Sequence, residues 1–212
     1  MMSGVINGTI IWITLMAALC LIAPGDHKWQ YRLSRRESRY WLMAAILQGM
    51  LIVHGYSVME QGLICILLGL LWFACITDHV GCYVYQVTWW LAWPAGMLLL
   101  WIGAAMTWER WLSLGIFVLL QEIWFARMYG RADCHAFVAC ALLETALGMD
   151  MQGYTLHMAV TFILLAVVQG AKHNIDRRGR LIVPKPLLPY IAVALSLMLF
   201  VTQLNEYAVR SA

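Results

Sequence analysis

Charged residues are scarce in this sequence, and their scarcity narrows the class of protein before any motif is considered. Of 212 residues, 63% are hydrophobic and only 12% are charged, whereas a soluble domain of this size carries about 25% charged residues. Apolar stretches of about 17–20 residues recur along the chain, the length that a helix needs to cross a bilayer. The alternation of polar and apolar residues that is typical of a membrane barrel is absent. The composition therefore predicts an all-α polytopic membrane protein.

The first residues lack the features of a cleaved signal peptide. Met1–Gly4 contains no basic residue, so the positively charged segment that opens a signal peptide is missing. The apolar run from Val5 to Pro24 is also long for the hydrophobic segment of a signal peptide. We therefore expect a first helix that is retained.

Several common catalytic and metal-binding motifs are also missing. No two of the six cysteines form a C-x-x-C pair, so the sequence does not support a zinc ribbon. It contains neither the H-E-x-x-H of zinc proteases nor the G-x-S-x-G of serine hydrolases. A cysteine–histidine protease stays open as an alternative, because Cys82 follows His79 and Cys134 adjoins Asp133. Gly81 disfavours a helix that would place His79 and Cys82 on one face.

Eight apolar segments are predicted to cross the membrane as helices. Most connections between them are brief and no soluble domain is inserted, so residues 1–212 are predicted to form a single transmembrane domain. The second segment is interrupted by His54-Gly55, and the sixth is short. The predicted spans are about 5–24, 41–58, 61–77, 87–106, 111–127, 134–149, 154–171 and 187–205.

Lysine and arginine are concentrated on one side of the predicted bundle. All of them except Arg110 and Arg210 lie in or beside the connections that follow the first, third, fifth and seventh spans. Because Lys and Arg tend to stay in the cytoplasm during insertion, both termini are predicted on the outer side of the inner (cytoplasmic) membrane. This topology and attraction to anionic lipid explain the basic connections 25–40 and 172–186. We therefore expect the bilayer, and no nucleic acid, as the partner of these connections.

Two aspartates are predicted to lie together at the cytoplasmic face. Asp78 follows the apolar stretch Ala74-Cys75-Ile76-Thr77, and Asp133 precedes the sixth span. Ionisable groups at the edge of a membrane bundle are costly and often functional. Two carboxylates held close share a proton, so that one activates water as a base while the other acts as an acid. The alternative is a pair of helix caps or topology-setting charges.

The stretch Gly130-Arg131-Ala132-Asp133 resembles the G-x-G-D signature of intramembrane-type aspartyl proteases. Together with Asp78 at the end of an apolar helix, the small apolar residues 136–142 and the proline-containing residues 183–190, it makes the chain similar to the type IV prepilin peptidases. The resemblance implies that Asp78 and Asp133 cleave the N-terminal leader of a type IV prepilin or pseudopilin at the cytoplasmic face. It implies no metal or organic cofactor.

The chain departs from this family pattern at four places. The proline that the family often has some residues after the first aspartate is missing. Ala132 replaces the second glycine, which makes positive φ costly, so the loop geometry is expected to differ. His135 stands where the family often has lysine. Residues 25–40 contain no cysteine, whereas many family members carry a cysteine-rich insertion there and also N-methylate their product. We therefore expect a compact peptidase, with S-adenosylmethionine required only if methyltransferase activity is retained.

Two other functions stay open as alternatives. The chain could be a bifunctional peptidase and N-methyltransferase, or a non-enzymatic transporter or assembly factor, whose coupling carboxylates would lie near the bilayer midplane.

Glu122 is expected to orient a catalytic aspartate. His79 and His135 could bind a metal or tune the aspartates, but we favour contacts with headgroups and water. Glu144, nearer the outer side, is expected to be structural, and the oligomeric state is not predicted.

Overall fold

The computed structural model describes residues 2–22, 35–52, 56–81, 83–103, 106–172, 174, 181 and 185–211. In these ranges the chain forms eight α-helices and one short 3-10 turn, with no β-strand. The all-α prediction is therefore confirmed. The helices are α1 (Met2–Leu21), α2 (Arg35–Met50), α3 (Val58–Gly81), α4 (Gln86–Gly103), α5 (Trp108–Ile123), α6 (Arg131–Ala146), α7 (Met151–Ala171) and α8 (Leu188–Ser211), and the turn is η2 (Phe125–Arg127).

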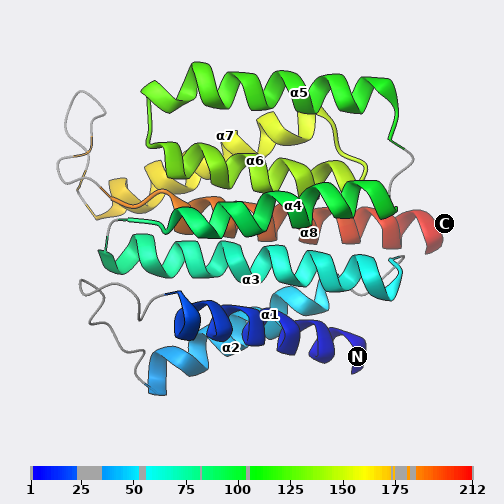
Figure 1. The fold of residues 1–212 in the computed structure, drawn as a ribbon, viewed down its shortest axis with the longest axis horizontal. Helices are drawn as coiled ribbons and strands as arrows, with labels where there is room; N and C mark the ends of the chain where they lie inside the picture. Colours follow the sequence, from blue (N-terminus) through cyan, green and yellow to red (C-terminus); the bar gives the residue numbers. More distant parts are fainter. Residues whose placement is uncertain are drawn as a thin grey trace.

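The helices lie roughly along one axis, so that their connections gather at the two ends of a bundle (Figure 1). α1 begins and α8 ends at the same end of this bundle. The last turn of α3 and the first turns of α6 and α8 lie at the opposite end. The termini thus share one end, as predicted, and the side of a membrane that this end faces stays a prediction.

Each predicted span corresponds to one observed helix, but several ends were wrong. α2 begins at Arg35, inside the basic connection, and ends at Met50 rather than at 58. Glu37 in its first turn favours this start, because a carboxylate stabilises the positive end of the helix dipole. α3 continues past the predicted end at 77 and through Gly81, so the expectation that Gly81 would disfavour a helix was wrong. His54, Gly55 and Cys82 lie outside the described residues.

Three of the described helices are long and apolar enough to cross a membrane, over Ser3–Leu21, Val58–Val80 and Met151–Ala171. The apolar part of α8, Leu188–Thr202, is shorter. α2, α5 and α6 have 16 residues each. At 1.5 Å per residue such a helix is about 24 Å long, somewhat less than the roughly 30 Å of a hydrocarbon core.

α6 is the central helix of the bundle. Every residue from Ala136 to Thr145 is buried, and α6 contacts α3, α4, α5, α7 and α8. Its fit against α4 is tight, because a side chain at Gly96 would come within 2.7 Å of Leu142. A helix buried on all sides has little freedom to shift, so the groups at its two ends are held at a fixed separation.

Candidate active site

Asp78 lies in the last turn of α3 and contacts the first residue of α8. Its carboxylate accepts a hydrogen bond from the backbone N–H of Leu188. Leu188 is the first residue of α8, so its N–H has no acceptor within the helix and is available to Asp78. The Cys75 thiol, one turn earlier on α3, donates to the Leu188 carbonyl at 3.4 Å. α3 therefore holds both backbone groups of Leu188.

The second oxygen of Asp78 is buried and has no hydrogen-bond partner among the described residues. Leaving a buried carboxylate oxygen unsatisfied costs free energy. Such an oxygen is usually explained by a catalytic role or by a bound water or ligand. It is therefore an atom of this site with unused capacity to accept a hydrogen bond.

Asp133 occupies the third position of α6. The N-cap of this helix is Gly130, with φ −64° and ψ 155°, so the alternative that Asp133 is itself the N-cap residue is wrong. Instead, its carboxylate accepts a hydrogen bond from the Gly130 N–H. This is one half of a capping box, in which the third residue satisfies the N–H of the cap.

Ala132 lies inside the first turn of α6, and the expectation that its loop differs from that of the family stays a prediction. A helical position has negative φ, which alanine adopts freely. Gly130 is also under no steric demand, since an added Cβ would lie 3.5 Å from the Asp133 carboxylate. Residues 130–133 therefore form the N-cap and first turn of a helix.

The negative charge of Asp78 acts on Asp133. Burial, and to a smaller extent the charge of Asp78, raise the pKa of Asp133 to about 7, against the opposing effect of the Gly130 N–H. Asp133 lies ahead of the segment 134–149 that is predicted to cross the membrane. Near neutral pH its carboxyl is thus present in both protonated and ionised forms, which an acid–base catalyst requires.

The structure places Glu122 beside His135 rather than beside an aspartate. The Glu122 carboxylate lies 3.3 Å from Nδ1 of His135, with the two side chains 36% and 23% exposed. Nδ1 has no hydrogen-bond partner, so the contact is electrostatic. The role of Glu122 in orienting an aspartate stays a prediction. His79 and Arg131 are exposed at the same end of the bundle, and the described residues contain no group of three or more metal-ligating side chains.

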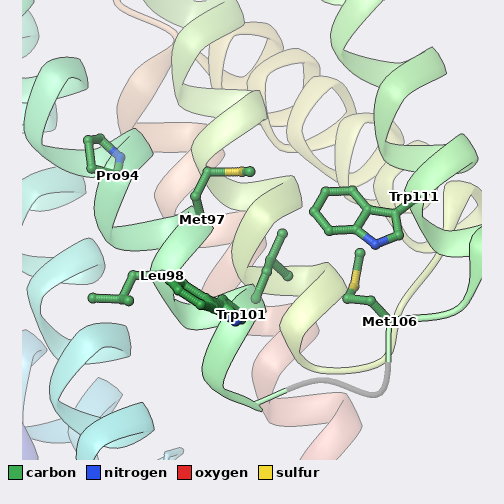
Figure 2. Close-up of a pocket in the computed structure, with 7 residues that line it drawn as sticks. Pro94, Met97, Leu98, Trp101, Met106 and Trp111 are labelled. Carbon is green, nitrogen blue, oxygen red and sulfur yellow. The ribbon is translucent and has the colours of Figure 1, made fainter.

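Two cavities lie along α4. One, of about 550 Å³, is lined by His135 and by residues of the first part of α4 (Gln86, Trp89, Trp90, Trp93, Pro94 and Met97). The other, of about 720 Å³, lies between the second part of α4 and α5, where Met97 and Trp111 project from the two helices (Figure 2). Neither is lined by the two aspartates, but the first reaches α6 two residues beyond Asp133.

Sequence reasoning missed the partners of the aspartates and one buried histidine. Leu188 and Cys75 carry no chemical signal of their own, because their roles depend on how α8 packs on α3. His157 did carry a signal, since an ionisable residue inside an apolar run is a candidate functional residue. It lies on α7 against Glu144, and both side chains are 1% exposed.

No protein-family model, curated protein or solved structure matches this chain.

Proposed function

We propose that the protein is a membrane aspartyl endopeptidase in which Asp78 and Asp133 hydrolyse a peptide bond. The supporting observation is that two half-buried carboxylates, carried by different helices at one end of the bundle, lie within electrostatic range of each other. Coupled carboxylates of this kind separate into an acid and a base. That division of roles is the one that peptide hydrolysis by water requires.

The surroundings of the two carboxylates favour different roles for them. Asp78 has one oxygen fixed by Leu188 and one buried oxygen without a partner, and we assign this second oxygen the role of accepting a proton from a water admitted with the substrate. Asp133, whose pKa is raised to about 7, carries a proton for much of the time. It donates that proton to the carbonyl oxygen or to the leaving amine. The pair titrates as a unit, so the two roles are exchanged as the reaction proceeds.

By the resemblance, the substrate is the N-terminal leader of a type IV prepilin or pseudopilin, cut at the cytoplasmic face of the inner membrane. Such a leader is short and is followed by an apolar helix. The position of the two aspartates at the helix ends suits this substrate, because its helix stays in lipid while the scissile bond reaches the interface. The concentration of lysine and arginine in the connections at this end also favours a cytoplasmic orientation.

The test is cleavage of a co-reconstituted prepilin by the wild type, Asp78→Asn and Asp133→Asn, read on a gel. Asp150→Asn is the matched control, because Asp150 is the N-cap of α7 and its side chain accepts from the Gln152 N–H at 2.9 Å. Asparagine also serves as an N-cap. We expect both dyad variants to insert normally and to lose cleavage while the control retains it. Full cleavage by either dyad variant would refute the proposal.

The transporter alternative requires a coupling carboxylate near the bilayer midplane. Asp78 and Asp133 lie at helix ends, and Glu144, although buried, lies two residues before the last residue of α6. A coupling carboxylate must also reach water from alternate sides of the membrane, and Glu144 is only 1% exposed and is held by His157. The peptidase is therefore the better-supported proposal. Binding of S-adenosylmethionine to the purified protein would identify the bifunctional enzyme instead.

A further inference from the structure

Glu144 and His157 form a buried pair that joins three helices. Glu144 on α6 lies 2.6 Å from Nδ1 of His157 on α7, and each side chain is 1% exposed. On its other side, Nε2 of His157 lies 3.0 Å from the backbone carbonyl of Ile191 on α8. Phe137 packs its ring against the imidazole, with centroids 5.7 Å apart. The imidazole therefore bridges α6 to α8.

The contacts of His157 fix the number of protons on the pair. A carbonyl oxygen only accepts, so Nε2 must carry a proton and donate it to Ile191. The short contact at Nδ1 then requires one further proton, held either by the imidazole or by the carboxyl. In both forms the pair is neutral overall, which is what a buried position demands. The pair is thus a short link that holds one proton between Nδ1 and Oε1, while Oε2 of Glu144 is buried without a hydrogen-bond partner among the described residues.

This link contacts the same turn of α8 that holds Asp78. Ile191 lies three residues after Leu188, whose N–H binds the Asp78 carboxylate. The first turn of α8 is therefore held by α3 at Leu188 and, through His157, by α6 at Ile191. α6 carries Asp133 at one end and Glu144 near the other, and the residues from Ala136 to Glu144 are all buried. One rigid helix thus connects the link to the second aspartate.

We infer that the Glu144–His157 pair is a positioning device for the two aspartates, which fixes the first turn of α8 against α6 and so sets Asp78 opposite Asp133. The inference rests on the proposed peptidase function for its effect on catalysis. Its effect on the interaction between the two carboxyl groups can be measured whether or not the protein cleaves a peptide.

The test variant replaces both partners, Glu144→Met together with His157→Leu, in the full-length protein. Removing both members leaves no unpaired charge in the core, and such replacements are often tolerated, whereas a single truncation is strongly destabilising. Glu144→Gln is the conservative variant, because its amide N–H donates to Nδ1 and preserves the bridge without the shared proton.

Thr145→Val is the matched control for loss of a buried polar contact. Thr145 lies next to Glu144, and its hydroxyl contacts the Ala141 carbonyl at 2.6 Å and the Tyr154 hydroxyl on α7. These contacts join α6 to α7 and do not involve α8. The control therefore perturbs the same depth of the bundle without touching the turn that holds Asp78.

Two measurements are made on each variant: kcat and KM for a prepilin, and the titration of Asp133 by NMR of protein labelled with ¹³C at the aspartate carboxyls. Loss of a signal in Asp133→Asn assigns the resonance. In the double variant we expect kcat to fall on the order of a hundredfold, as a misplaced catalytic group does, with KM unchanged. Asp133 should titrate at lower pH, because Asp78 is farther away. Glu144→Gln and Thr145→Val should keep both values.

Three results would overturn the inference. The first is a double variant that keeps the wild-type kcat and Asp133 titration. The second is a Thr145→Val variant that loses activity to the same extent, since the effect would then be general destabilisation. The third is a Glu144→Gln variant as defective as the double variant, which would assign the pair to proton transfer. If the wild type cleaves no prepilin, the proposed function fails, and the Asp133 titration still decides the positioning role.

Discussion

Replacing Asp133 by asparagine should stabilise the protein at alkaline pH while abolishing its activity. The Asp133 carboxyl has a pKa of about 7 in the folded protein, against an ordinary value of 3.8. Between these two pH values the folded state holds more protons than the unfolded state. The wild type therefore loses stability as the pH rises from about 4 to about 7, and the loss is complete above that range.

The size of this effect follows from the difference between the two pKa values, about three units. At 1.36 kcal/mol per unit, ionised Asp133 costs up to about 4 kcal/mol of unfolding free energy at pH 8. This is an upper limit, because the side chain is only half-buried. Asparagine has the same shape, stays neutral, and still accepts from the Gly130 N–H. The variant should thus equal the wild type near pH 4 and exceed it increasingly up to pH 8.

Thermal unfolding in one detergent at several pH values between 4.5 and 8 measures this difference. Asp150→Asn serves as the control for replacing an aspartate that caps a helix outside the pair. The reasoning would be refuted if Asp133→Asn were no more stable than the wild type at pH 8. It would also be refuted if the gain did not shrink as the pH fell.

The remaining predictions concern the pair and the packing of the first two helices. Asp78→Asn should lower the pKa of Asp133, because the charge of Asp78 is one cause of its rise, but not to 3.8, because burial is the larger cause. Carboxyl NMR measures this pKa. An unchanged titration of Asp133 would mean that the two groups do not interact. Gly49→Ala should destabilise the fold by about 1–3 kcal/mol, because its Cβ would clash with the Gly8 backbone where α1 meets α2. At Gly62 in α3, an added Cβ would meet no atom within 4 Å, so Gly62→Ala should stabilise the fold by up to about 1 kcal/mol. Thermal unfolding measures both glycine variants. A Gly49→Ala variant more stable than Gly62→Ala would contradict the described packing.

The number and type of the helices could be predicted from the sequence because the length of an apolar run is a local property. The helix ends were less predictable, since they depend on polar residues that the apolar pattern does not count. Arg35 and Glu37 extend α2 into the basic connection, and Asp78 and His79 lie within α3 rather than after it. Each is a polar residue that continues a helix beyond its apolar part.

The candidate site was predictable only in its two aspartates. Counting spans and placing the basic residues puts Asp78 and Asp133 at one end of the bundle, and the structure shows them there. The groups that bind them come from tertiary packing: the Leu188 N–H is offered by a helix far along the chain. The pairing of Glu144 with His157 depends in the same way on how α7 packs back against α6, which a single sequence does not specify.

The hydrogen bond between Asp78 and Leu188 also sets the order in which the site can be completed. The chain is synthesised from its N-terminus, and Leu188 begins the last helix. While that helix is still inside the ribosome, Asp78 lacks the donor that fixes one of its oxygens. The helices from α1 to α7 therefore precede the donor on which one carboxylate of the pair depends. The proposed peptidase would gain a fixed Asp78 only after α8 had packed against α3.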